Sequence, residues 1–361
     1  MKKLSLIFAG CLATGAVQAQ LVSSADVFIG SGVIVTVNTE MTNAGSFKSE
    51  GDLHLRKGLN NQGQMSLNGQ VVLDGEGTQL IQSTQPITAG TLVLSQMGKV
   101  ALRAPLLVER QLTLGDGIIE NNEFNVLSLG PQAQVTGASN RSHVKGYMRK
   151  LGEDAFSFPV GNGTHLQAFA LSKPNGYDEV QVGYVSQNPT RLSSQRAIEV
   201  ADLNTDSYWA VQSNNAAPRQ ITVASATNER QIVQLRNNEW QLTPTTTTNN
   251  SLSSEAVLRG ATYFTIGTQR AELAEKPDVS IYPNPSNGSF EVRLKGFISE
   301  ENISFDVIDL TGKSLVRQAG QVKDLKTKYT LGNDVKEGNY ILRVVRTDKN
   351  QVFNQKLSIH K

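Results

Sequence analysis

The first third of the chain alternates apolar and polar residues over short runs. Between residues 27 and 137 these runs are separated by Gly, Asn and Asp, and no stretch shows a sustained helical period. Such alternation predicts β-strands with one buried face. The expected strands are Gly32–Asn38, Gly51–Leu55, Gly69–Asp74, Gly90–Ser95, Lys99–Leu102, Gln111–Gly115 and Asn125–Leu129.

A turn sequence repeats within this region. Asn43-Ala-Gly45 and Asn61-Gln-Gly63 lie 18 residues apart. That spacing approximates one coil of a parallel β-solenoid, in which each coil stacks on the next and buries its inward side chains. An antiparallel sandwich would give strands of similar length. The recurring turns and the scarcity of tight hairpin dipeptides favour the solenoid, and we expect a solenoid-like repeat region over residues 20–140.

Aromatic residues become frequent near residue 140, in Ser142–Lys150 and Phe156–Gly161. Residues 141–268 predict a β-sandwich domain, and Trp209 and Trp240 are expected in its core rather than stacked on a sugar at the surface. The expected strands are Gln167–Ser172, Glu179–Val185, Ser207–Gln212, Arg219–Ala224, Gln231–Leu235 and Thr262–Gly267.

Two polar segments of this domain predict loops. Thr243–Ser251 is expected to be a polar loop with no fold of its own. Asp202–Asp206 resembles the first half of a calcium-binding loop, but the sixth position is Ser207 instead of Gly and the twelfth is Ser213 instead of Glu. We therefore expect a solvated turn at Asp202–Asp206.

The last part of the chain forms a separate module. Residues 269–278 are charged and lack alternation, which predicts a linker. Strands resume over residues 279–361 and predict a small C-terminal β-sandwich, so the whole chain is expected to be all-β. The expected strands are Ser289–Leu294, Ile303–Asp309, Lys313–Arg317, Asn339–Val345 and Gln351–Ile359.

The N-terminus carries an export signal. Residues 1–19 have a basic start, an apolar stretch too short for a membrane span, and a small-residue cleavage site ending at Ala19. We expect the mature chain to begin at Gln20. Phe8–Cys11 resembles the lipobox of a lipoprotein signal, which is the alternative, but Cys11 comes early and a good cleavage site follows it.

Composition narrows the chemistry of the mature chain. Cys11 is the only cysteine, so the mature chain has no disulfide, thiolate metal site or cysteine nucleophile. The formal charge is +2, and removal of Lys2 and Lys3 brings it to about 0 (2 − 2). A neutral chain without a basic cluster argues against nucleic acid or an anionic membrane as the main partner.

No catalytic, cofactor or metal site is expected. The four histidines have no second ligand at metal-binding spacing, and no nucleophile elbow or phosphate loop is present. Gly115–Gly117 and Gly161–Gly163 are expected to be turns. Glycan-active β-helices need converging carboxylates, whereas Asp74 with Glu76, and Asp116 with Glu120, are expected at Gly-rich turns. The histidines are His54, His143, His165 and His360.

Four short elements follow one another in the C-terminal module. They are Tyr282-Pro283-Asn284-Pro285 with Gly288, then Asp309 with Gly312 and Lys313, then Gly338 with Tyr340, then Lys361. Their order resembles the C-terminal sorting domain of cargo of the Bacteroidota type IX secretion system. Val144 and Gly146 ahead of Phe156–Gly161 resemble a junction common in exported surface proteins of that group.

This resemblance implies a route for the protein. The chain would enter the periplasm, be recognised by the type IX translocon and cross the outer membrane. A sortase would remove the domain within residues 269–278, and the product would be secreted or attached to the outer-membrane surface through lipopolysaccharide. We expect a structural or adhesive passenger with a glycan or protein ligand. The alternatives are a glycan-active enzyme on a β-helix and an accessory component of the secretion or gliding apparatus.

Overall fold

A computed structural model describes residues 21–224, 229–270, 276–347 and 351–361. The chain divides into two compact units, the N-terminal unit Met1–Thr268 and the C-terminal unit Gln269–Lys361. The predicted signal peptide and its cleavage site at Ala19 and Gln20, together with residues 271–275 of the predicted linker, lie outside the described residues. Within the described residues, no helix has the length and hydropathy to cross a membrane.

Strands make up almost all of the regular structure, and the all-β prediction is confirmed. Two short 3-10 turns, Pro189–Arg191 and Val322–Asp324, lie between strands. The solenoid strands are β1 (Leu21–Ser23), β2 (Val27–Ile29), β3 (Ile34–Val37), β4 (Met41–Asn43), β5 (Ser46–Ser49), β6 (Asp52–Leu55), β7 (Leu59–Asn61), β8 (Gln64–Leu73), β9 (Gly77–Ser83), β10 (Ile87–Leu102), β11 (Leu106–Glu120), β12 (Leu127–Leu129), β13 (Gln134–Thr136) and β14 (Ser142–Lys145).

Most of the remaining strands of the N-terminal unit pair antiparallel, while β15 also pairs parallel with the solenoid strand β12. They are β15 (Tyr147–Gly152), β16 (Phe156–Phe158), β17 (Phe169–Leu171), β18 (Asp178–Val185), β19 (Val200–Leu203), β20 (Tyr208–Ser213), β21 (Pro218–Ala224), β22 (Arg230–Arg236), β23 (Glu239–Leu242), β24 (Thr245–Thr248), β25 (Ser251–Val257) and β26 (Gly260–Gln269).

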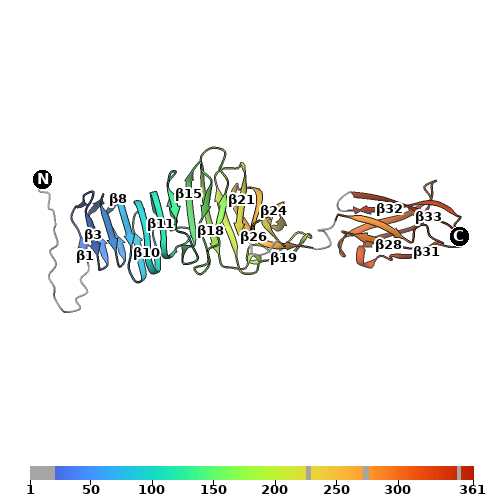
Figure 1. Cartoon of the computed structure of the whole chain (residues 1–361), viewed down its shortest axis with the longest axis horizontal. Coiled ribbons are helices and arrows are strands. Elements are labelled where there is room, and N and C mark those ends of the chain that lie inside the picture. The colour runs from blue at the N-terminus through green and yellow to red at the C-terminus, as the bar shows by residue number, and fades with distance from the viewer. Residues whose placement is uncertain (1–20, 225–228, 271–275, 348–350) are drawn as a thin grey trace. The chain divides into compact units, whose positions relative to one another are not determined.

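The solenoid strands stack in three parallel columns, as predicted for a β-solenoid (Figure 1). In one column β1 pairs with β4, β4 with β7 and β7 with β9. In the second, β2 pairs with β5 and β5 with β8. In the third, β3 pairs with β6 and β6 with β8. Strands β10 and β11 run through all three columns, because each is long enough to bend around the coil without leaving the ladder.

Stacked amides mark the coil repeat. Asn43 Nδ2 donates to Asn61 Oδ1 at 2.7 Å across one coil, and Asn61 Nδ2 donates to Ser83 Oγ at 2.9 Å across the next. The sequence separation is 18 residues for the first pair and 22 for the second. Glycines stack as well, because a Cβ on Gly63 would lie 2.0 Å from the carbonyl oxygen of Gly45. The repeated Asn-x-Gly turn is therefore a close contact between neighbouring coils.

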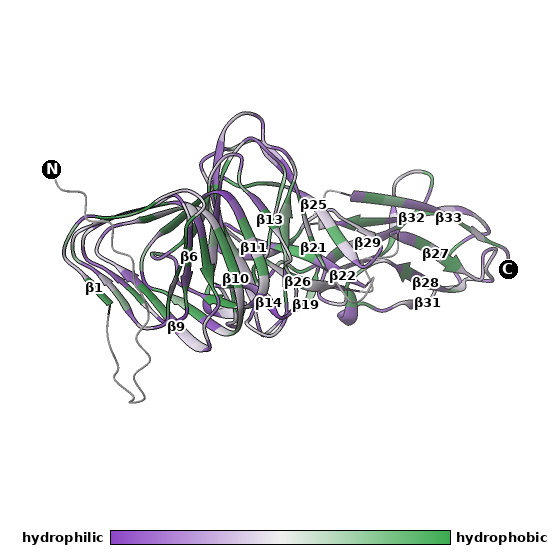
Figure 2. Ribbon diagram, turned by 60° about the vertical axis from the view of Figure 1, so that its left-hand side comes forward, coloured by the Kyte–Doolittle hydropathy of each residue, from purple (hydrophilic) through white to green (hydrophobic). Residues whose placement is uncertain are grey.

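The apolar core of the solenoid continues into the antiparallel strands. Inward residues such as Leu53, Leu94 and Leu112 are buried, and they join one cluster that extends to Phe264. Along β6, apolar Leu53 and Leu55 alternate with polar Asp52 and His54, and Figure 2 colours the strands by this hydropathy. Burial of each large aliphatic side chain stabilises the fold by about 1.5–3 kcal/mol. The boundary expected near residue 140 is thus a change of strand pairing inside one compact unit.

The change of pairing occurs at the predicted junction motif. β15 pairs parallel with β12 on one edge and antiparallel with β18 on the other. Val144 and Val160 form a parallel bridge. Buried His143 contacts the carbonyl of Ser139 through Nδ1, and its Nε2 accepts a hydrogen bond from the Gly163 amide. Burial lowers the pKa of His143 and so favours the neutral ring, although the hydrogen bond to Ser139 acts in the opposite direction.

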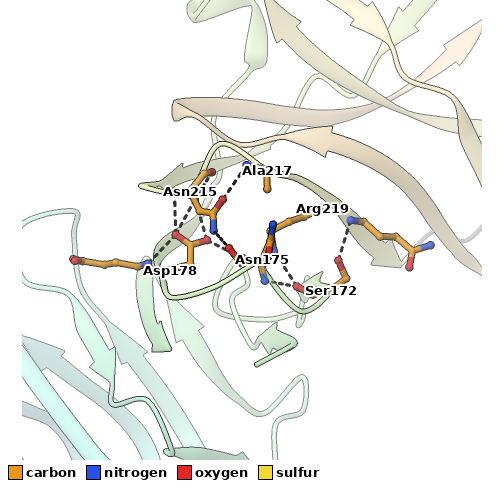
Figure 3. Close-up of polar contacts among 9 residues, drawn as sticks. Ser172, Asn175, Asp178, Asn215, Ala217 and Arg219 are labelled. Atoms are coloured by element: carbon orange, nitrogen blue, oxygen red, sulfur yellow. Dashed lines mark hydrogen bonds and ion pairs between the residues drawn. The ribbon is translucent and has the colours of Figure 1, made fainter. Parts of the chain in front are cut away.

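A buried ion pair joins the two sheets of the antiparallel region (Figure 3). Arg219 Nη1 on β21 lies 2.9 Å from Asp178 Oδ2 on β18, and both side chains are at most 3% exposed. Asp178 also accepts hydrogen bonds from the Ser213 hydroxyl and the Asn215 amide. Arg219 donates to the carbonyl oxygen of Ser172. Each charge is therefore matched, as burial requires.

Two expectations about loops in this unit are wrong. Thr245–Thr248 forms β24 and pairs with β25, because β-branched threonines suit a strand and Asn249-Asn250 take positive φ in a tight turn. Gly115–Gly117 lies inside β11, as do Asp116 and Glu120, so these acids are strand residues rather than turn formers. An alternating hydrophobic pattern cannot predict a strand made of threonines. It also cannot predict that a strand such as β11 bends while its hydrogen bonds to neighbouring strands continue.

The C-terminal unit contains two antiparallel sheets over one core. Phe290 and Val292 of the first sheet share an apolar cluster with Phe305, Val307 and Leu342 of the second. The first sheet contains β27 (Asp278–Tyr282), β28 (Ser289–Lys295) and β31 (Lys328–Thr330). The second has the order β30 (Ser314–Gln321), β29 (Asn302–Ile308), β32 (Gly338–Arg346), β33 (Gln351–Ile359).

Replacement of Asn61 by alanine is predicted to destabilise the solenoid. The Asn61→Ala change removes two hydrogen bonds, the one from Asn43 Nδ2 and the one to Ser83 Oγ, each worth about 0.5–1.5 kcal/mol. Far-UV circular dichroism during thermal unfolding of the chain from Gln20 would show a lower midpoint. Asn60→Ala, at the neighbouring outward position, is the control. Equal unfolding midpoints for both variants would contradict a stabilising role of the side-chain hydrogen bonds between stacked coils.

Loss of one partner of the Asp178–Arg219 pair is predicted to cost much more than loss of an exposed pair. Asp178→Asn leaves the Arg219 charge buried and unpaired, at a cost of about 3–5 kcal/mol. The control Glu179→Gln breaks an exposed pair with Arg149 and should cost about 0–1 kcal/mol. Urea unfolding followed by the fluorescence of Trp209 and Trp240 reports on this unit, because both lie in it. Indistinguishable unfolding curves for the two variants would contradict a stabilising role of the Asp178–Arg219 pair.

Candidate sorting surface

The Tyr-Pro-Asn-Pro segment follows β27 and binds the outer edge of β33. Asn284 Nδ2 donates to the carbonyl oxygen of Lys356 at 2.6 Å, and Asn284 Oδ1 accepts from the amide of Ser358 at 2.9 Å. One side chain thus satisfies a donor and an acceptor of an edge strand. The two peptide bonds before Pro283 and Pro285 are cis.

Ser286 continues this contact through its backbone. Its amide donates to the carbonyl oxygen of Ser358 at 2.8 Å, and its carbonyl accepts from the amide of His360 at 2.8 Å. The hydroxyl of Ser286 accepts from the amide of Gly288 at 2.9 Å. Sequence reasoning did not identify Ser286, since a residue that acts mainly through its backbone leaves little signal in a sequence.

Gly288 and Lys361 meet at the same place. Gly288 has a φ of +105°, which favours glycine, and a Cβ there would lie 3.7 Å from Cε of Lys361. The amide of Lys361 donates to Glu337 Oε1 at 2.7 Å, and its ammonium donates to the carbonyl oxygen of Gly332 at 3.1 Å. The last residue is therefore fixed to the loop that precedes β32.

The Asp309 turn closes the hairpin between β29 and β30. Asp309 Oδ1 accepts from the hydroxyl and the amide of Thr311 and from the amide of Lys313. The Thr311 hydrogen bond is the main cause of a lowered Asp309 pKa, so the carboxylate stays charged in the turn. Gly312 has a φ of +88°, as the predicted tight turn requires.

The third element places Gly338 and Tyr340 at the start of β32. Gly338 pairs with Ile359 of β33. Tyr340 is buried in the core, and its hydroxyl donates to the carbonyl oxygen of Lys336 at 2.8 Å. Tyr340 is therefore a packing residue, whereas Tyr282 is 60% exposed and lies under the guanidinium of Arg293 at 4.6 Å.

Strand pairing brings these elements to one end of the C-terminal unit. β29 ends at Ile308, opposite Ile341 of β32, so the Asp309 turn lies beside the start of β32. β32 starts opposite the end of β33, and Ser286 forms a bridge with Ile359 at that end. We call this group the motif end. Its residues are Tyr282, Pro283, Asn284, Pro285, Gly288, Asp309, Gly312, Lys313, Gly338, Tyr340 and Lys361.

The opposite end of the sheet is held by a different interaction. Arg346 Nη2 donates to Glu301 Oε2 at 2.7 Å, and both side chains are at most 3% exposed. The Arg346 guanidinium also lies 4.9 Å from the centroid of the Phe297 ring. Arg270, at the start of this unit, contacts Glu300 at the same end. The two ends of the unit therefore differ, with a structural ion pair at one and backbone contacts of the sorting elements at the other.

The tryptophans and the calcium-loop-like segment of the N-terminal unit have structural roles within that unit. Trp240 is fully buried and Trp209 is 3% exposed, which confirms their placement in the core. Each indole N–H donates to a backbone carbonyl, that of Ser193 from Trp240 and that of Gln167 from Trp209. Of the segment predicted as a turn, Asp202 lies in β19 and residues 204–206 connect β19 to β20 through local side-chain hydrogen bonds.

Acidic residues of the solenoid contact basic side chains. Asp74 Oδ2 lies 2.8 Å from His54 Nδ1, and Glu120 Oε1 lies 3.0 Å from the ammonium groups of both Lys99 and Lys145. Burial alone would raise the pKa of Glu120, but the hydrogen bonds from the two lysines outweigh it and lower the pKa. In the part of the chain that the structure describes, His, Asp and Glu form no group of three with metal-binding geometry.

Comparison with known proteins supports the assignment of the C-terminal unit. Residues 280–360 match a family described as the secretion system C-terminal sorting domain. No curated protein matches the chain. Among solved structures, the chain is similar to dimeric latent PorU from Porphyromonas gingivalis, with 11% identity and a TM-score of 0.19. That match covers 55% of this chain and 26% of PorU, and a likeness of this size supports no argument about fold or function.

The matched residues contain the whole motif end except Lys361. Residues 280–360 therefore form a secretion system C-terminal sorting domain, which supports the resemblance to cargo of the type IX secretion system and implies export to the cell surface or secretion.

Proposed function

We propose that the motif end is the part of the sorting domain that the translocon recognises. We also propose that the passenger is a structural or adhesive protein without enzymatic activity. The observation that carries the first proposal is the convergence of the four sorting elements at the end of the unit where β32 starts and β33 ends. An edge strand whose backbone groups are held in register offers a defined surface for a partner to recognise.

The outward surface of the solenoid supports the second proposal. Stacked outward positions on one column are Gln70, Thr91, Gln111 and Gln134. Gln111 Nε2 lies 3.4 Å from the hydroxyl of Thr113 and 3.3 Å from that of Thr136. Rows of amides and hydroxyls can hydrogen-bond a glycan or a protein. Asp74, Asp116 and Glu120 contact basic side chains, whereas glycoside hydrolysis uses two carboxyl groups on opposite sides of one bond.

The proposed route begins with export to the periplasm and ends with removal of the sorting domain by a sortase within residues 269–278. The product is then released or attached to surface lipopolysaccharide. A tag placed upstream of residue 269 allows the passenger to be followed after cleavage. In a host without type IX secretion, the tagged passenger should be retained in the periplasm, and identical location in both hosts would refute the route.

Replacement of Asn284 is predicted to reduce export. Asn284→Ala removes two hydrogen bonds to β33, each worth about 1 kcal/mol, and should lower the amount of passenger at the surface or in the medium on the order of tenfold. The control Asn302→Ala changes an exposed asparagine at the opposite end of the same sheet. Protease resistance of the purified variants separates a sorting defect from unfolding. Wild-type export of a folded Asn284→Ala protein would contradict the proposal.

The passenger is predicted to bind polysaccharide or cell-surface protein without turnover. A panel of polysaccharides is incubated with the purified chain, and both retention on the immobilised panel and release of reducing ends are measured. Glu120→Gln changes the acid with the most cationic contacts, and Glu50→Gln is the control at an acid that contacts Lys48. We expect background turnover for all three proteins. Turnover that Glu120→Gln abolishes would establish the enzyme alternative instead.

A further inference from the structure

The first coil of the solenoid has an open edge. Its strands β1, β2 and β3 pair with β4, β5 and β6 of the following coil. Among the described residues, no strand pairs with their other edge. The other end of the solenoid differs, because β15 and the antiparallel strands continue the ladder beyond β12. Repeat proteins need a cap at each end, so the open edge requires an explanation.

Each of the three columns has an exposed apolar residue at an outward position of the first coil. Val22, Phe28 and Ile34 are 58%, 62% and 68% exposed. The residues stacked under them in the second coil are Thr42, Lys48 and Asp52, and those in the third coil are Asn60, Ser66 and Gln70. The change from polar to apolar is therefore confined to the coil that has the open edge.

The same three residues present their backbone groups at that edge. The carbonyls of Ser23, Ile29 and Val33 accept hydrogen bonds from the second coil. Since a strand directs alternate residues to opposite neighbours, the N–H and C=O groups of Val22, Phe28 and Ile34 point away from the second coil. A partner that covers this edge must therefore supply backbone donors and acceptors as well as apolar contact.

The first coil also lacks the usual protection of a free edge. Natural proteins guard edge strands with Lys, Pro or inward charges. Residues 21–37 contain no Lys, Arg or Pro, and Asp26, in the connection between β1 and β2, is their one charged residue. Two copies of this end would consequently meet with little charge repulsion.

We propose that the first coil is an interface between two copies of the mature chain. A partner that pairs with β1, β2 and β3 at once must follow the same three-sided path, and a second copy of this coil does so. A two-fold axis perpendicular to the solenoid and through β2 places β2 antiparallel to its own copy and β1 against β3 of the partner. Phe28, whose backbone faces the edge, then lies opposite Phe28 of the partner subunit.

The test uses the chain from Gln20 to Lys361, from which the predicted signal peptide is absent. Sedimentation velocity over a range of concentrations should show a particle of twice the monomer mass. Phe28→Lys combined with Ile34→Lys places charges on the edge and should weaken dimerisation at least tenfold. The control Phe124→Lys changes another exposed phenylalanine, 77% exposed, and should leave the dimer unchanged. Circular dichroism confirms that each variant is folded.

A cross-link tests the geometry separately. The chain from Gln20 has no cysteine, so Phe28→Cys introduces a single thiol. Opposed residues of a hydrogen-bonded antiparallel pair lie about 5.5 Å apart, which suits a disulfide. Mild oxidation should convert Phe28→Cys, but not Phe124→Cys, into a covalent dimer. A monomeric wild-type chain, a dimer unaffected by the two lysines, or equal cross-linking of both cysteine variants would each overturn the proposal.

Discussion

Hydrogen bonding between successive coils is the interaction on which the N-terminal unit depends. A coil cannot bury its inward residues by itself, so Leu53, Val71 and Leu92, at equivalent positions of three coils, are buried only because the coils stack. The same dependence makes both ends of the stack special. At one end β15 turns the parallel ladder into an antiparallel sheet, and the Asp178–Arg219 pair joins that region to the second sheet.

The sequence predicts the solenoid where its period is constant. Asn43 and Asn61 repeat because their side chains touch across a coil of 18 residues, while the next contact, from Asn61 to Ser83, spans 22 residues and changes residue type. Later coils lengthen at their turns, which alters the spacing without breaking the ladder. Thr245–Thr248 shows a different limit, because its pairing with β25 depends on the Asn249-Asn250 turn and not on an apolar face.

The sorting elements were recognisable individually, yet their convergence was not. The contacts of Asn284 with Lys356 and Ser358 span 72 and 74 residues, and pairing at such a distance depends on the whole sheet order. Gly288 and Lys361 likewise become neighbours only once β33 lies beside the segment at Ser286. The sequence motif thus identifies the residues of the surface, but only the order of the antiparallel strands shows that they lie together.

Separate hydrophobic cores explain how one chain can contain both a passenger and the sorting domain that directs its export. The cluster around Leu53 and Phe264 and the cluster around Phe305 and Leu342 share no residue. Each unit also has its own buried ion pair, Asp178–Arg219 in the N-terminal unit and Glu301–Arg346 in the C-terminal unit, so each of these charges is matched within its own unit. Under the proposed route, a sortase removes the sorting domain from the passenger. The passenger would then retain the core and the ion pair that its own residues form.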